Sequence, residues 1–199
     1  MKFIIASKNK KKIAELERIL NPLGIDAVTE NDLNITIPEV EETGETFAQN
    51  AYLKAFSACK ASSLPAIADD SGLCVDALGG APGVYSARYS GENATDKSNN
   101  ALLIENLKEF SKNERTAKFC CAISVVFPNG DSIRCSGECK GRIGFEPSGD
   151  GGFGYDPYFY VGENSFASLT AKEKDKISHR GNALRELKVK LKEYLDADK

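Results

Sequence analysis

The chain has 199 residues, near the upper end of one ordinary domain, with 41% hydrophobic and 28% charged residues, which is typical of a globular protein and too apolar for a disordered one. The net charge of −3 argues against a nucleic-acid partner, and the longest mostly apolar run, Phe119–Phe127, falls far short of the roughly 18 residues of a membrane-spanning helix. We therefore expect a single domain over residues 1–199 with no nucleic-acid or membrane partner, and a cytoplasmic location, because the apolar run Phe3–Ala6 is too short for a signal peptide.

The first third of the chain alternates between extended and helical patterns. The expected elements are a strand at Lys2–Ala6, a loop at Ser7–Asn9, a helix from Lys10 to the break at Asn21–Gly24, an extended stretch at Asn34–Ile37, an acidic segment at Glu39–Glu45 and a helix at about Thr46–Ala61. The first helix is indicated by Ile13, Leu16, Ile19 and Leu20 at helical spacing. The second has Phe47, Ala51, Ala55 and Ala58 on one face.

The rest of the chain adds strands, turns and helices without a linker or repeat. The expected elements are an apolar strand at Leu64–Ala68 that ends at Asp69–Asp70, a strand at Leu73–Leu78, a turn at Gly79–Gly83, a helix at about Asp96–Phe110, a hairpin of Lys118–Phe127 and Ser132–Ile143, a glycine-rich loop at Gly149–Asp156, a strand at Tyr158–Val161 and helices at about Ala171–Ile177 and Asn182–Leu195. This mixture predicts an α/β domain built on a mixed sheet.

Six cysteines, at positions 59, 74, 120, 121, 135 and 139, form no Cys-x-x-Cys pair. The single histidine is far from all of them in sequence, so the spacing typical of a zinc site is absent. Four of the six lie in apolar or alternating runs, where cysteine acts as a small hydrophobe. We expect free, buried thiols.

The first loop is a candidate anion site. Asn9 is a good N-cap, and Lys10, Lys11 and Lys12 fill the first helical turn. Cations there oppose the helix dipole by about 0.3–1 kcal/mol each, but a bound phosphate would reverse the sign. The alternative is a solvated helix start.

Acidic residues mark a candidate metal site. Adjacent carboxylates such as Asp69 and Asp70 repel each other unless a cation or proton intervenes, and Mg²⁺ prefers carboxylate and phosphate oxygens. Ligands in α/β proteins bind at strand ends, where we place this pair. Further acids, Glu39, Glu41 and Glu42, precede the second helix. The alternative is a turn, because Asp-Asp-Ser-Gly is good turn chemistry.

Two later segments could hold a base. In the loop Gly151–Pro157, Phe153 offers a face for stacking and Asp156 can accept hydrogen bonds, although a tight turn with Phe153 in the core is the alternative. Lys174 and His179-Arg180 form a donor-rich patch. Donors suit the O6 acceptor of a 6-oxo purine and would face the amino group of adenine, at about 1–3 kcal/mol for each unpaired buried donor. A lone histidine is more often structural.

Together and in this order, these segments resemble the inosine/xanthosine triphosphate pyrophosphatase family. The matching stretches, which span nearly the whole chain, are Ser7-x-Asn9-x-x-Lys12, Glu42-Thr43-Gly44-x-Thr46-Phe47, Ala68–Leu73, Gly79–Arg88, Gly152–Pro157 and Glu173-Lys174 through Ser178-His179-Arg180. Where the family often has Thr and then Gly, this chain has Ser7, which keeps the hydroxyl, and Lys8, which adds a charge.

The resemblance implies a homodimer of elongated, two-lobed α/β chains, each with a long central mixed sheet and a cleft between the lobes. It also implies magnesium-dependent hydrolysis of ITP, dITP and XTP to the monophosphate and pyrophosphate. Glu42 and Asp70 look like the magnesium ligands, with Glu39 or Glu41 as alternatives to Glu42, and Asp70, beside Asp69, looks like the catalytic base. The substrate-binding residues that the resemblance implies are Ser7, Lys8, Asn9, Lys10, Lys11, Lys12, Lys54, Ser71, Phe153, Gly154, Tyr155, Asp156, Lys174, His179 and Arg180.

Two rival functions are weighed against this one. A pyrophosphatase for pyrimidine or other modified nucleotides is disfavoured by the His179-Arg180 patch, and a nucleotide-binding regulator without catalysis is disfavoured by the Asp69-Asp70 pair. The sequence does not rank ITP, dITP and XTP.

Overall fold

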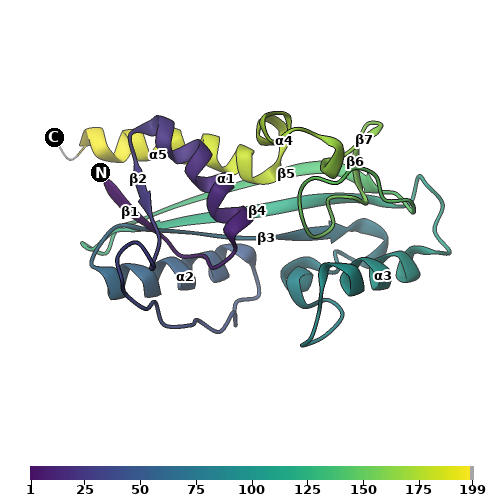
Figure 1. Ribbon diagram of the computed structural model, residues 1–199, viewed down its shortest axis with the longest axis horizontal. Helices are drawn as coiled ribbons and strands as arrows, with labels where there is room; N and C mark the ends of the chain where they lie inside the picture. Colours follow the sequence, from purple (N-terminus) through teal and green to yellow (C-terminus); the bar gives the residue numbers. More distant parts are fainter. Residues whose placement is uncertain (198–199) are drawn as a thin grey trace. The chain divides into compact units, whose positions relative to one another are not determined.

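The computed structural model describes residues 1–197, without the side chains of Ile19 and Leu23, and has an α/β fold on an open sheet of order β2-β1-β3-β4-β5-β6-β7 (Figure 1). The strands are β1 (Lys2–Ile5), β2 (Asp26–Val28), β3 (Ala66–Val75), β4 (Thr116–Val126), β5 (Ser132–Ile143), β6 (Phe159–Val161) and β7 (Asn164–Ser165). The α-helices are α1 (Lys10–Leu20), α2 (Phe47–Ser62), α3 (Asp96–Leu107), α4 (Ala171–Ile177) and α5 (His179–Ala197). None of these helices, within residues 1–197, has the length and apolar character to cross a membrane.

The sheet is mixed, as the sequence predicts. β1 pairs in parallel with β2, where Lys2 lies opposite Asp26, and with β3, where Ile4 lies opposite Ala66. β6 pairs antiparallel with both β5 and β7. The predicted hairpin is confirmed, because β4 and β5 are neighbours in the sheet and the Phe127 N–H donates to the Asp131 carbonyl 3.0 Å away across the turn.

The chain forms two compact units. Unit 1 comprises residues 1–70, 121–137 and 180–199, and unit 2 comprises residues 71–120 and 138–179. The three longest strands, β3, β4 and β5, therefore contribute residues to both units.

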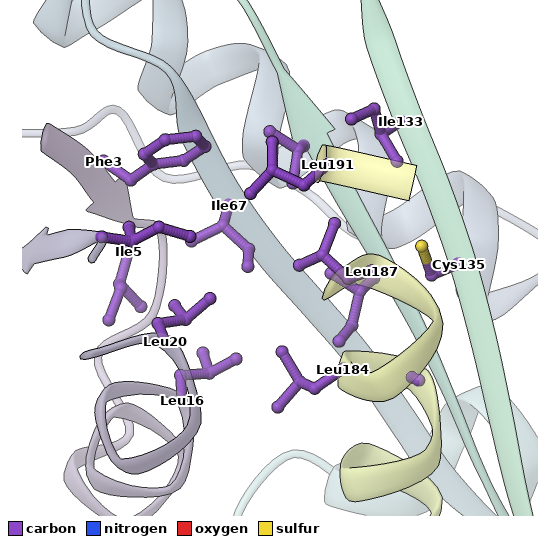
Figure 2. Close-up of a cluster of buried hydrophobic side chains, with 14 of the residues drawn as sticks. Phe3, Ile5, Leu16, Leu20, Ile67, Ile133, Cys135, Leu184, Leu187 and Leu191 are labelled. Carbon is purple, nitrogen blue, oxygen red and sulfur yellow. The ribbon is translucent and has the colours of Figure 1, made fainter. Parts of the chain in front are cut away.

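Unit 1 has a core on each face of its strands, because side chains alternate between faces along a strand. Phe3 and Ile5 of β1 belong to a cluster with Leu16 of α1 and Leu184 and Leu187 of α5 (Figure 2). Residues of the other parity, Ile4 of β1 and Ala66 and Ala68 of β3, pack instead with Ala55 and Ala58 of α2. The alanine face predicted for α2 is thus buried, and α2 lies across the sheet from α1 and α5 (Figure 1).

Unit 2 has a separate, aromatic core. The ring of Phe119 in β4 lies 4.7 Å from that of Phe159 in β6 and 5.7 Å from that of Phe166, measured between centroids. Leu103 and Leu107 of α3 belong to the same buried cluster.

The extended stretch predicted at Asn34–Ile37 is wrong. Asn34 lies in a turn with φ of 51°, and the second strand is the shorter segment Asp26–Val28. Gly24, in the left-handed conformation with φ of 73°, reverses the chain after α1, so the next residues run beside β1. A three-residue strand is too short to show alternation in sequence.

The break predicted between Leu64–Ala68 and Leu73–Leu78 is also wrong. β3 continues from Ala66 to Val75, so Asp69 and Asp70 lie within a strand and not at its end. The chain does not turn at Asp69 and Asp70. Both carboxylates instead bind cations of neighbouring helices. α5 likewise begins at His179, three residues earlier than expected.

The six cysteines are free, as expected, but the expectation that all of them are buried is wrong. Cys74 in β3 and Cys120 in β4 are partly exposed, whereas the other four, at positions 59, 121, 135 and 139, are buried.

Candidate active site

The loop before α1 places Asn9 as the predicted N-cap. The Asn9 side-chain oxygen accepts hydrogen bonds from the backbone N–H groups of Lys11 and Lys12, at 3.0 and 3.2 Å. The first turn contains no acidic residue, and Lys10 and Lys11 are exposed. The Ser7 hydroxyl accepts from the Asn9 N–H at 3.2 Å. This end of α1 thus presents positive charge and a hydroxyl at a helix N-terminus, which suits an anion.

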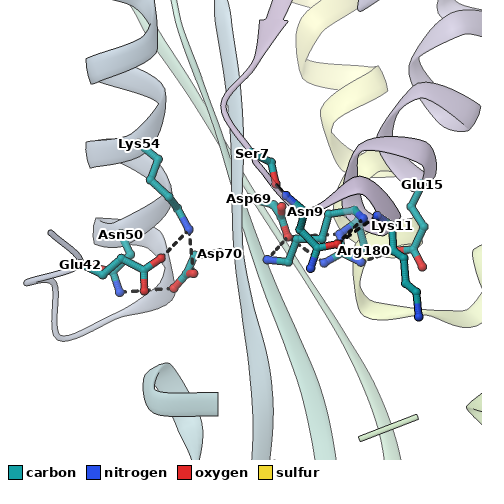
Figure 3. A network of polar contacts seen from close by, with 11 residues as sticks. Ser7, Asn9, Lys11, Glu15, Glu42, Asn50, Lys54, Asp69, Asp70 and Arg180 are labelled. Atoms are coloured by element: carbon teal, nitrogen blue, oxygen red, sulfur yellow. Dashed lines mark hydrogen bonds and ion pairs between the residues drawn. The ribbon is translucent and has the colours of Figure 1, made fainter. Parts of the chain in front are cut away.

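Asp69 binds two cations on the α1 and α5 side of β3. Its Oδ2 accepts from Arg180 Nη2 at 2.8 Å and Nε at 3.2 Å, and it lies 3.2 Å from Lys12 Nζ. Arg180 Nη1 also donates to Glu15, which lies one turn after Lys12 in α1 (Figure 3). The side chains of Asp69 and Arg180 are 0% and 2% exposed, so this is a buried charge network whose two anions balance its two cations.

Asp70 belongs to a second network on the α2 side of the same strand. Lys54 Nζ lies 2.9 Å from Asp70 Oδ1 and 3.0 Å from Glu42 Oε1, so one ammonium bridges two carboxylates (Figure 3). Glu39 and Glu41 are exposed, and Glu39 Oε1 lies 3.8 Å from Lys8 Nζ. Of Glu39, Glu41 and Glu42, the structure therefore brings Glu42 to Asp70.

Asn50 connects the Glu42 loop to Asp70. Its Nδ2 donates to Asp70 Oδ2 at 3.3 Å, and its Oδ1 accepts from the Gly44 N–H at 2.8 Å. A Cβ on Gly44 would lie 2.5 Å from that Oδ1, so only glycine fits there. Thr46 begins α2 with a capping box through Gln49. The motif Glu42–Phe47 is thus a loop whose backbone is fixed by the first turn of α2.

The two aspartates titrate in opposite directions. Burial would raise the pKa of Asp69, but Arg180 and then Lys12 outweigh it and hold the pKa far below its usual value. For Asp70, burial is the largest influence, and together with repulsion from Glu42 it outweighs the attraction of Lys54, so the pKa is raised. Asp69 is therefore a fixed anion, whereas Asp70 is better suited to accept a proton.

The glycine-rich loop in unit 2 is organised by Asp156, which is buried. Its Oδ2 accepts from the Phe153 N–H and from Lys174 Nζ, both at 2.8 Å. The same ammonium lies 5.0 Å from the centroid of the Phe153 ring. A donor and an acceptor therefore sit beside one aromatic face.

The rest of this loop is fastened to unit 2. The Gly154 N–H donates to Asp96 at 2.8 Å, and the Gly154 carbonyl accepts from Asn100 at 2.9 Å. Tyr155 is a core residue whose hydroxyl donates to the Ser86 carbonyl at 2.8 Å. His179 is also buried, and its ring stacks on Phe119 at 4.8 Å with an interplanar angle of 14°.

Two residues of these networks were missed by the sequence reasoning. Asn50 is a buried amide four residues before Lys54, on a helix whose other buried residues are alanines and one cysteine, and Glu15 lies three residues after Lys12. Helical spacing from a predicted lysine was the available signal for both. The remaining predicted residues are Lys8, exposed beside Glu39, and Ser71, half-buried within β3.

Comparisons with known proteins cover nearly the whole chain. The sequence model of the Ham1 family matches residues 3–190. A dITP/XTP pyrophosphatase of Exiguobacterium sibiricum is 47% identical over 197 residues, which cover 98% of this chain and 99% of that protein. A dITP/XTP pyrophosphatase of Shigella flexneri is 50% identical over 188 residues, covering 92% and 94%. The solved structure of a HAM1 protein from Coxiella burnetii aligns with a TM-score of 0.87 and 42% identity, covering 97% of this chain and 99% of that one.

Proposed function

The chain belongs to the Ham1 family, and we propose that it hydrolyses the non-standard purine nucleoside triphosphates dITP, XTP and ITP to the monophosphate and pyrophosphate. It is a hydrolase of the α–β phosphoanhydride and removes these nucleotides from the pool. The whole chain, residues 1–199, acts as one enzymatic domain in this proposal. The observation that carries it is the Lys54 ammonium shared by Glu42 and Asp70. The neighbouring carboxylate in β3, that of Asp69, binds Lys12.

The Glu42 and Asp70 carboxylates fit a divalent cation. Two acids face one lysine there, so the network has an excess of negative charge, which is also why Glu42 raises the pKa of Asp70. Residues 1–197 contain no group of three or more acidic, histidine or cysteine ligands, and Mg²⁺ commonly takes one or two carboxylates together with substrate phosphate oxygens. When bound, Mg²⁺ would neutralise phosphate charge and acidify water. We assign Glu42 and Asp70 as its ligands.

The chain's own residues supply the rest of the proposed reaction. A water oxygen attacks the α-phosphorus in line, the bond from that phosphorus to the bridging oxygen breaks, and pyrophosphate leaves. Asp70 takes the proton of the water, a role that suits its raised pKa and contributes about 10²–10⁴-fold. Lys54 and Lys12 stabilise the charge that develops on the phosphates, with Lys12 oriented by Asp69. Ser7, Asn9, Lys10 and Lys11 hold the triphosphate at the start of α1, near Lys8.

We assign purine recognition to Phe153, Asp156, Lys174 and His179, with Ser71, Gly154 and Tyr155 contributing to the substrate site. Phe153 stacks on the base, while Lys174 and Asp156 supply the donor and acceptor that pair with O6 and a ring N–H of a 6-oxo purine. Adenine would meet the donor with its amino group, which a buried hydrogen-bonding site rejects strongly.

Arg180 has a double role in this proposal. Its guanidinium donates hydrogen bonds to Asp69 and Glu15, and Asp69 also orients Lys12. In this proposal the same guanidinium also contacts the base. We expect Arg180→Ala to narrow the preference for ITP over ATP. An unaltered ratio of the two kcat/KM values would remove Arg180 from base recognition.

A product assay tests the proposed function. The protein is incubated with ITP, XTP, GTP, ATP, CTP and UTP, with Mg²⁺ or with a chelator, and pyrophosphate and orthophosphate are measured separately. We expect pyrophosphate to be released from ITP and XTP, and only when Mg²⁺ is present. Orthophosphate as the product, or no turnover of any nucleotide, would overturn the proposal, as would a preference for pyrimidine triphosphates in the same assay. Light scattering during size-exclusion chromatography tests the dimer that we also propose.

A further inference from the structure

The glycine-rich loop of unit 2 contains a tight turn whose first and last residues carry two of the base-reading groups. In this turn, Phe153–Asp156, the Asp156 N–H donates to the Phe153 carbonyl at 3.2 Å. Phe153 supplies the aromatic face and Asp156 the acceptor in the proposed function, on which this inference rests. The spacing between the ring and the carboxylate therefore depends on how the turn is held.

The turn is held at Gly154 by one face of α3. The hydrogen bond that closes the turn uses its end residues, so the N–H and the carbonyl of Gly154 need partners elsewhere. The N–H donates to Asp96 Oδ2 at 2.8 Å, and the carbonyl accepts from Asn100 Nδ2 at 2.9 Å. Asp96 and Asn100 are four residues apart in α3 and so lie on the same face of the helix. Both peptide groups of one glycine are thus bonded to a single helix.

α3 is itself fixed within unit 2. Leu103 and Leu107 pack into the aromatic core of the unit. Asn99, which is buried, donates to the Ser86 carbonyl at 3.3 Å, and the same carbonyl accepts from the Tyr155 hydroxyl at 2.8 Å. Tyr155 is the third residue of the turn, so α3 is connected to the turn by a second route.

We propose that Asp96 and Asn100 are positioning residues for purine recognition. By fixing Gly154, they hold the Phe153 ring and the Asp156 carboxylate at the spacing that one base requires. Neither of them touches the nucleotide in this proposal. Because both peptide groups of Gly154 are already bonded to α3, this glycine contributes the shape of the turn to the site.

Steady-state kinetics with ITP and ATP test the proposal. Asp96→Ala removes the acceptor of the Gly154 N–H, and KM for ITP should rise about tenfold, near the lower end of what one charge-assisted hydrogen bond contributes. We expect kcat to change by less than about twofold, because a looser base site weakens the substrate and the transition state alike. The ratio of kcat/KM for ITP over ATP should fall, since Asp156 accepts from the ring N–H of a 6-oxo purine, which adenine lacks.

These readouts separate positioning from stability. Loss of folded enzyme alone would lower kcat and leave both KM and the ITP/ATP ratio unchanged, and that result in Asp96→Ala would overturn the proposal. Asn100→Ala, which removes the donor to the Gly154 carbonyl, should change KM and the ratio in the same direction. Asn106→Ala is the matched control on the same helix, because it loses only an exposed contact of 2.8 Å with the Tyr89 hydroxyl, and it should keep both values.

A conservative variant separates the hydrogen bond from the charge at the start of α3. Asp96→Asn loses the negative charge that the helix dipole favours but keeps an acceptor oxygen, so it should raise KM for ITP by less than about threefold. Equal increases in Asp96→Asn and Asp96→Ala would assign the effect to the charge and contradict the positioning role.

Hydrogen exchange measures the contact without any nucleotide. Exchange in the segment of residues 149–158 is followed by mass spectrometry in the unaltered protein, Asp96→Ala and Asn106→Ala. The Gly154 amide should exchange faster in Asp96→Ala only, and an unchanged rate would show that Asp96 does not hold the turn. If the unaltered protein releases no pyrophosphate from ITP, the proposed function fails. If it does release pyrophosphate and Asp96→Ala keeps its KM, only the positioning role fails.

Discussion

Asp69 and Asp70 are consecutive residues of β3, yet their carboxylates bind cations on opposite faces of the sheet. Asp69 lies with Arg180 of α5 and Lys12 of α1, and Asp70 lies with Lys54 of α2. The period of two along a strand imposes this separation. The same chemical change at two adjacent positions should therefore have two different consequences.

Asp70→Asn should abolish turnover and leave the fold intact. The amide keeps the size of the side chain but accepts a proton poorly and removes one proposed metal ligand, so we expect kcat to fall by at least the 10²–10⁴-fold of general-base catalysis. The raised pKa of Asp70 shows that its charge is not favoured in the fold, so the free energy of unfolding should stay equal or rise. Steady-state rates and urea unfolding at pH 7 check both parts. Turnover at the unaltered rate would remove Asp70 from the mechanism.

Asp69→Asn should instead destabilise the protein. Arg180 and Lys12 would lose the buried anion that compensates them, and breaking such a network by removing one partner costs about 3–5 kcal/mol. Urea unfolding at pH 7 measures the loss, with Asp131→Asn in the exposed turn after β4 as a control of the same chemistry. A free energy of unfolding within about 1 kcal/mol of the unaltered protein would contradict the role of Asp69 as a buried anchor.

The stabilisation by Asp69 should depend on pH with a defined sign. Its pKa is lower in the folded chain than the roughly 3.9 of an unfolded aspartate, so its contribution is complete above about pH 5 and declines as the pH falls below that. The difference in unfolding free energy between the unaltered protein and Asp69→Asn should shrink steadily between pH 5 and pH 3. Asp70, present in both proteins, cancels in this difference. A gap that stays constant over that range would show that the carboxylate charge is not the cause.

Local patterns predicted the local structure well. Spacing of apolar residues located α1 and α2, the Asn9 cap is formed as expected, and Pro128-Asn129-Gly130-Asp131 does close the hairpin of β4 and β5. The predictions were wrong where contacts between residues far apart in the sequence determine the local structure. Asp69 looked like the end of a strand, but β3 continues past it, and Arg180, 111 residues later, binds its Oδ2.

The candidate site was also only partly predictable from the sequence. The sequence did not decide which of Glu39, Glu41 and Glu42 is the metal ligand, because neighbouring acids in a loop carry no periodic signal. Their ranking depends on how Asn50 in α2 holds Gly44, a contact six residues apart that fixes the loop and turns Glu42 towards Lys54. The opposite faces of Asp69 and Asp70 would have followed from strand alternation, had the strand been predicted to continue.

Lys54→Met should make the protein depend on the divalent cation for its stability. Without the ammonium, Glu42 and Asp70 are left facing each other, and each kcal/mol lost lowers the midpoint of thermal unfolding by about 2–4 °C in a domain of this size. Added Mg²⁺ should therefore raise the midpoint more in Lys54→Met than in the unaltered protein, and a chelator should reverse the gain. Lys60→Met, on the same helix beside Phe56, is the control. Equal Mg²⁺ responses in all three proteins would place the cation elsewhere.

Gly152→Ala should weaken substrate binding through Asp156. Gly152 has φ of 71°, and a Cβ there would lie 2.1 Å from Asp156 Oδ2, the atom that accepts from Phe153 and Lys174. Gly162 has φ of 63° with nothing within 4 Å of its Cβ among the described residues, so Gly162→Ala suffers only the left-handed strain of about 1–2 kcal/mol. Both variants should unfold at lower temperature, but only Gly152→Ala should raise KM for ITP, by about tenfold or more if one charge-assisted hydrogen bond of about 1.5–3 kcal/mol is lost. Equal KM values in the two variants would mean that strain alone acts and that Asp156 does not touch the purine.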